Sequence, residues 1–149
     1  MLGAVLALAL TLMPQDAPSM HARGTFDVTI TPVAAEPGAA PDAHGRMLIA
    51  KTYHGEIEGT GEGEMLATMG PDQSGAYVAI ERVRGTVNGR EGAFTLIHRG
   101  VMDRGAQDLS ITVSPGSGTG ALTGIAGTYV LTIEAGIHRY ALDYSLPAE

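Results

Sequence analysis

From Gly24 onward, apolar and polar side chains alternate along the chain, which is the two-residue period of a half-buried β-strand. Residues 24–31 show the pattern clearly, because Phe26, Val28 and Ile30 share one face and polar side chains share the other. Seven more stretches have strand character: 46–54, 56–66, 76–87, 92–102, 108–115, 128–135 and 136–146. No long helical period interrupts them, so the sequence predicts an all-β protein with eight strands.

The segments between these strands are mostly short and contain turn residues. Asn88-Gly89 lies between two strand-like runs and is the strongest short hairpin signal known. A tight turn is expected at 135–136, and a longer loop at 32–45, which holds three prolines. The glycine-rich connection near 116–127 is expected to hold one short helical turn at 121–125.

Short connections favour antiparallel pairing, and an antiparallel sheet of this length must close or fold into a sandwich to hide its edges. We therefore predict a single eight-stranded antiparallel barrel over residues 24–146. The interior of such a barrel is either filled by side chains or holds one small ligand.

Residues 1–23 are interpreted as a leader that stands apart from the barrel. Leu2 to Met13 form an apolar run that is too short to span a bilayer as a helix. It fits a signal peptide with a cleavage site near Ala17, which predicts export to the periplasm or secretion. No Lys or Arg precedes the apolar run, which weakens this interpretation. The alternative, which stays open beside it, is that translation starts at Met20 and the protein is cytoplasmic.

The composition excludes several classes of function. The net charge is −7 and only nine Lys and Arg are present, so neither nucleic acid nor an anionic membrane surface is an expected partner. The absence of cysteine excludes disulfides, thiolate metal sites and cysteine nucleophiles. Because no HExxH, phosphate-loop, dinucleotide or nucleophile-elbow motif occurs either, we expect no metal site and no cofactor.

Residues 54–66, HGEIEGTGEGEML, place four glutamates on one face of a strand and glycines on the other. The simplest interpretation is a solvated outer face, with glycines that let the strand coil as the barrel closes. A bulge at Gly61 or Gly63 would reverse the alternation and turn Glu64 inward. Glu64 is therefore a candidate binding residue.

Glu81 and His98 are the candidate catalytic residues. They lie on the two strands joined by the Asn88-Gly89 hairpin, and His98 shares an apolar face with Phe94 and Leu96. If this face is interior, a buried carboxylate beside an imidazole forms a general acid–base pair, with Tyr77 as an orienting hydroxyl. The alternative is a structural pair in which each group satisfies the other.

Lys51 and Tyr140 complete the candidate ligand-binding residues, with Phe94, Leu96 and Tyr77. An interior Lys51 needs a carboxylate, either Glu64 or Glu81, whereas at a frayed strand end its ammonium would reach water. Tyr140 shares a face with His138, and this face is either a polar interior wall or aromatic core packing. His138 lies close enough to the 135–136 turn to be exposed.

Four blocks in order, GTFDVTITP, GRMLIAKTYHGEIEGTGEGEML, the run from Ser74 to Tyr129 and GIHRYALDYSL, resemble a bacterial family of domains of unknown function, DUF3224. The resemblance covers essentially Gly24 to Leu146. It implies an eight-stranded barrel of the allene oxide cyclase-like kind, distantly similar to dirigent proteins and lipocalins. It also implies an interior able to house an apolar ligand, but it assigns no activity and no catalytic residue.

These observations lead to two functional hypotheses of different classes. The first is a barrel that binds a small apolar molecule, with an isomerase- or cyclase-like reaction if Glu81 and His98 act as an acid–base pair. The second is a structural or interaction protein with a packed interior and no ligand. The sequence does not determine the oligomeric state.

Overall fold

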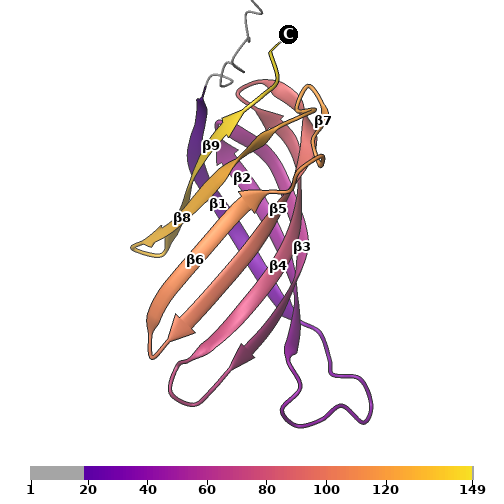
Figure 1. Ribbon diagram of the computed structural model, residues 1–149, viewed down its shortest axis with the longest axis vertical. Coiled ribbons are helices and arrows are strands. Elements are labelled where there is room, and N and C mark those ends of the chain that lie inside the picture. Colours follow the sequence, from indigo (N-terminus) through magenta and orange to yellow (C-terminus); the bar gives the residue numbers. More distant parts are fainter. Residues whose placement is uncertain (1–18, 149) are drawn as a thin grey trace, which may run out of the picture.

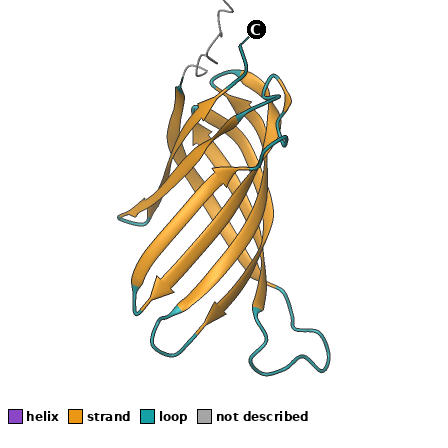
Figure 2. Cartoon of the chain, viewed as in Figure 1, coloured by secondary structure: helices purple, strands orange, loops and turns teal. Residues whose placement is uncertain are grey.

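The computed structural model describes residues 19–148, which form one antiparallel β-barrel without α-helix (Figures 1 and 2). Eight long strands build the wall: β1 (Met20–Pro32), β2 (Gly45–Gly55), β3 (Ile57–Met69), β4 (Gly75–Val87), β5 (Arg90–Asp103), β6 (Ala106–Val113), β8 (Ala126–Glu134) and β9 (Ile137–Ser145). The two-residue β7 (Thr119–Gly120) pairs with one end of β5. The predicted all-β fold with an eight-stranded antiparallel barrel is confirmed.

The ring closes in the order β4-β3-β2-β1-β9-β8-β6-β5, and β5 pairs back with β4. Pairing between β4 and β5 runs from the Asn88-Gly89 turn to Gly75 opposite Met102. Both turn residues have positive φ, 49° and 77°, as a two-residue type I′ hairpin requires. The same geometry joins β8 to β9 through Ala135 and Gly136, at 50° and 78°.

Two boundaries differ from the sequence-based expectation. The first strand begins at Met20, and Ala22 is fully buried, so residues 20–23 belong to the barrel and not to the leader. Residues 121–125 form successive turns but no helical turn. Gly120 and Gly124 have φ of 60° and 78°, in the left-handed region, which interrupts right-handed helical geometry at both sides of this segment.

The leader hypotheses concern residues that lie mostly outside the described part of the chain. Residues 1–18 are not described, so the structure does not bear on the signal peptide or the alternative start at Met20. Among residues 19–148, no helix is long and apolar enough to cross a bilayer.

The two ends of the barrel are built differently. At the end that holds the Asn88-Gly89 turn, the segment after β6 folds over the interior and buries Leu122 and Ile125, each 1% exposed. These side chains join a core of aliphatic and aromatic residues that fills this half of the barrel. At the other end, near the turns that follow β3, β5 and β8, no segment of residues 19–148 forms such a cover, and apolar side chains there are partly exposed.

One seam of the barrel is short. Strand β6 pairs with β8 only at Ile111 opposite Tyr129 and Thr112 opposite Thr128. From there the tip of the β8–β9 hairpin stands away from β6 (Figure 1). The wall is therefore continuous around the packed end and divided on one side of the uncovered end.

Candidate functional site

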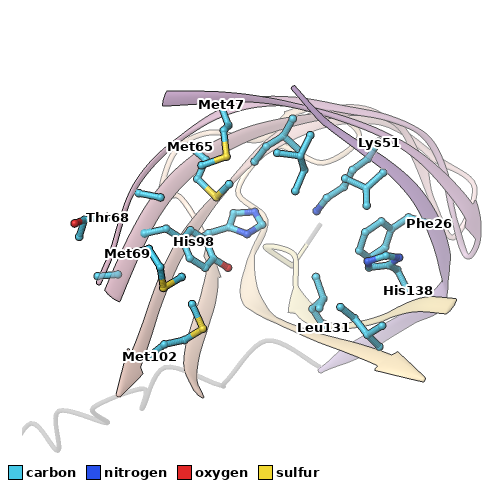
Figure 3. A pocket seen from close by; sticks show the side chains of 17 residues that line it. Phe26, Met47, Lys51, Met65, Thr68, Met69, His98, Met102, Leu131 and His138 are labelled. Atoms are coloured by element: carbon cyan, nitrogen blue, oxygen red, sulfur yellow. The ribbon is translucent and has the colours of Figure 1, made fainter. Parts of the chain in front are cut away.

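A cavity of about 370 Å³ occupies the uncovered half of the barrel. Its wall is largely apolar, and four methionines from β2, β3 and β5 line one side (Figure 3). These are Met47, Met65, Met69 and Met102. Leu131 and His138 approach from the β8–β9 hairpin on the opposite side. Methionine side chains are flexible and polarizable, so this wall can adapt to apolar molecules of different shapes.

Exposure falls steeply from the rim of the cavity to its floor. At the rim, Met69 is 60% exposed and Ile133 is 59% exposed. At the floor, Lys51 and His98 are 6% and 4% exposed. The cavity is thus an apolar funnel that ends on an ammonium and an imidazole.

Directly beneath this floor lies Glu81, whose side chain is fully buried. Its Oε2 accepts a hydrogen bond from Lys51 Nζ at 2.8 Å and lies 2.9 Å from His98 Nε2. Its Oε1 accepts one from the Tyr53 hydroxyl at 2.7 Å. Tyr129 in turn donates to the Tyr53 hydroxyl at 3.5 Å, so β2, β4, β5 and β8 all contribute to one network.

A glycine of the acidic stretch makes room for this carboxylate. Gly61 faces inward on β3, and a Cβ at that position would overlap Glu81 Oε1 and lie 3.1 Å from Tyr53 Cε2. Any larger residue would therefore displace the network. The glycine is required by the packing of the site, in addition to any effect on strand curvature.

The network keeps Glu81 ionised. Burial by itself would raise the pKa of this carboxyl, but the hydrogen bond from His98, the charge and hydrogen bond of Lys51, and the Tyr53 hydroxyl lower it from 4.5 to about 2. Burial raises the pKa of Tyr53, and the charge of Glu81 raises it further, so this hydroxyl keeps its proton and donates.

Lys51 is held from two sides. Its Nζ lies 4.5 Å from the centroid of the Phe26 ring, in addition to its bond to Glu81. Burial lowers the pKa of the ammonium, and Glu81 offsets part of this effect. Because Lys51 and Glu81 carry opposite charges, the pair introduces no net charge into the interior.

The structure brings Glu81, His98 and Lys51 together, but it excludes Glu64 from the site. Glu64 is exposed on the outer face of β3 and forms a two-point ion pair with Arg46 at 2.9 Å. The solvated outer face is therefore the correct interpretation, and the alternative in which a bulge turns Glu64 inward does not occur, because β3 pairs with β2 and β4 in unbroken register at Gly61 and Gly63.

The other candidate binding residues divide between the two halves of the barrel. Tyr77 lines the cavity and packs over Gly100. Phe94 and Leu96 are at most 1% exposed in the packed core, and they do not line the cavity. Tyr140 is also buried there, and its hydroxyl accepts a 2.7 Å hydrogen bond from the Ile57 amide. For these three residues the geometry favours packing over ligand contact.

Sequence reasoning missed several members of the site. For His138 the sequence allows both an interior wall and an exposed position near the turn; the side chain is half-buried, and its ring centroid lies 5.1 Å from that of Phe26. Tyr53 and Tyr129 were assigned no role, although strand alternation does place Tyr53 on the face of Lys51. Within residues 19–148, no group of three or more His, Asp or Glu is arranged to hold a metal ion.

Comparison with known proteins establishes the family. A family model described as "Protein of unknown function (DUF3224)" matches residues 22–144. The chain belongs to this family. A crystal structure of a DUF3224 protein of unknown function from Shewanella oneidensis MR-1 is 40% identical to it, with a TM-score of 0.81 over 89% of this chain and 100% of that chain. No curated protein matches the chain.

Replacement of Glu81 by Gln is expected to lower the free energy of unfolding at pH 7 by about 3–5 kcal/mol, because it leaves the buried Lys51 ammonium without a counter-charge. Urea unfolding followed by circular dichroism measures this. Glu64→Gln is the matched control and should change stability little, since its ion pair is exposed. Adding Lys51→Met to Glu81→Gln should restore most of the lost stability, because it removes the unpaired ammonium. An equal loss of stability in Glu81→Gln and Glu64→Gln would contradict the role of Glu81 as the counter-charge of Lys51.

The stabilising effect of Glu81 should also disappear in acid. Its pKa is lower in the folded state, so its contribution is complete above about pH 4.5 and is lost as the pH falls toward 2. The free-energy difference between the wild type and Glu81→Gln should therefore shrink by about 3 kcal/mol over this range. Urea unfolding at pH 6, 4, 3 and 2 measures the difference, and a constant value throughout would refute the assignment.

Proposed function

We propose that the barrel binds a small apolar molecule in the cavity between the methionine wall and the β8–β9 hairpin. The observation that carries this proposal is the cavity itself, about 370 Å³ in volume, apolar at its sides and polar only near its floor. Ligand sites in proteins usually fall between about 300 and 1,000 Å³ and combine apolar walls with a few placed polar groups. The rival hypothesis of a packed interior accounts for the other half of the barrel but not for this one.

A second candidate function is proton transfer on the bound molecule, as in an isomerase or cyclase. The observation that favours it is the hydrogen bond between Glu81 and His98 at the base of the cavity. A carboxylate that orients an imidazole toward a substrate is a common arrangement for general base catalysis. In this proposal His98 touches the substrate, while Glu81, which does not line the cavity, positions it. The similarity to allene oxide cyclase-like barrels that the sequence implies supports this candidate only as a fold analogy.

Binding can be tested with the fluorescent apolar probe N-phenyl-1-naphthylamine. We expect saturable enhancement of its emission with one site per chain. Ala67→Phe places a ring in the cavity and should weaken binding at least about tenfold, which corresponds to 1.4 kcal/mol. Ala50→Phe, on the exposed face of β2, is the matched control and should bind like the wild type. Non-saturable emission, or equal loss in both variants, would exclude binding in the cavity.

Proton transfer can be tested with 2-tetralone, an apolar ketone with acidic C–H bonds next to its carbonyl. In D₂O the wild type should accelerate replacement of these hydrogens by deuterium above the buffer rate, as measured by proton NMR. Glu81→Gln and His98→Phe should lose the acceleration, and Glu64→Gln should retain it. If His98→Phe still accelerates the exchange, His98 is excluded as the general base.

A further inference from the structure

The two ring nitrogens of His98 have different surroundings. Nε2 lies 2.9 Å from Glu81 Oε2. Nδ1 makes no hydrogen bond to any group within residues 19–148. Every fully buried side-chain nitrogen in that range has a hydrogen-bond partner, so Nδ1 is not fully buried. Nδ1 must therefore border open space, and the open space beside His98 is the cavity. Figure 3 shows the imidazole extending from the wall toward the cavity centre.

The bond to Glu81 determines which ring nitrogen carries the hydrogen. An ionised carboxylate can only accept hydrogen bonds, so Nε2 must be the donor. Lys51 already balances the charge of Glu81. A second proton on the imidazole would leave a net positive charge at a site that is 4% exposed. A neutral imidazole that donates through Nε2 carries its lone pair on Nδ1.

The neighbouring Lys51 does not compete for this lone pair. Its Nζ donates to Glu81 at 2.8 Å and to the Tyr53 hydroxyl at 3.4 Å, and it faces the Phe26 ring. The hydrogen bonds that the ammonium makes within residues 19–148 thus go to the network and not to His98. The acceptor that the floor presents to the cavity is Nδ1 of His98.

We propose that the natural ligand is an apolar molecule with one hydrogen-bond donor, a hydroxyl or N–H group, that binds Nδ1 of His98 while its apolar body occupies the methionine-lined funnel. This inference rests on the proposed binding function and specifies the ligand class for that site. Hydrocarbons, ethers and carboxylate anions are selected against, because each leaves the Nδ1 lone pair without a donor.

The tautomer can be measured without any ligand. In protein labelled with ¹⁵N-histidine at pH 7, His98 should show one nitrogen shift typical of a protonated nitrogen at Nε2 and one typical of an unprotonated nitrogen at Nδ1. The His98→Phe spectrum identifies the signals by their loss. The reverse tautomer, or two protonated nitrogens, would overturn the inference even if the cavity binds apolar probes.

The ligand class can be measured with three probes of one shape: naphthalene, 2-naphthol and 2-methoxynaphthalene. Each is titrated against N-phenyl-1-naphthylamine bound to the full chain. We expect 2-naphthol to displace the dye at roughly fivefold to tenfold lower concentration than either of the others, the effect of one added hydrogen bond. His98→Phe should abolish this preference. His54→Phe, which changes an exposed histidine on the outer face of β2, should keep it.

The outcomes separate this inference from the proposed function. Equal displacement by 2-naphthol and 2-methoxynaphthalene overturns the ligand class and leaves apolar binding intact. A lack of saturable dye binding overturns the binding function itself. If His98→Phe does not fold, the tautomer measurement and the three-probe comparison on the wild type still decide the question.

Discussion

The buried carboxylate of Glu81 is the constraint on which the interior of this barrel depends. A charged group without access to water must have its acceptor positions occupied by donors, and here three side chains from two other strands supply them. Lys51 and Tyr53 come from β2, and His98 comes from β5. Gly61 of β3 leaves the space that the carboxylate occupies. One charge thus determines residue choices on four neighbouring strands.

This network also divides the interior into two environments. On one side lies a core closed by Leu122 and Ile125, and on the other lies a cavity with methionine walls. A buried ion pair is weak as a source of stability, because apolar residues of similar volume often stabilise a fold equally well or better. Because an apolar plug would serve packing alone, packing by itself does not account for Lys51 and His98 at the cavity floor.

The sequence predicts the barrel well because strand alternation is a local property. Alternation also places Glu81 and His98 on the same face of one hairpin, as diagonal neighbours on its two strands, where a single turn determines the register. The sequence does not decide between Glu64 and Glu81 as the partner of Lys51, since that choice depends on whether β3 keeps its register without a bulge. The sequence equally does not predict that Phe94 and Leu96 lie in the packed half of the barrel. Alternation indicates which side chains point inward, but it does not indicate which end of a barrel is covered.

The short ladder between β6 and β8 has consequences for hydration. A barrel normally has no strand edges, but here the backbone groups of β6 before Ile111 and of β8 after Tyr129 lack each other as partners. Amides and carbonyls in that position depend on water or on another molecule for their hydrogen bonds. Leu131 and Ile133 of β8 line the cavity in this region, so unpaired backbone groups adjoin its side wall, in addition to the imidazole at its base.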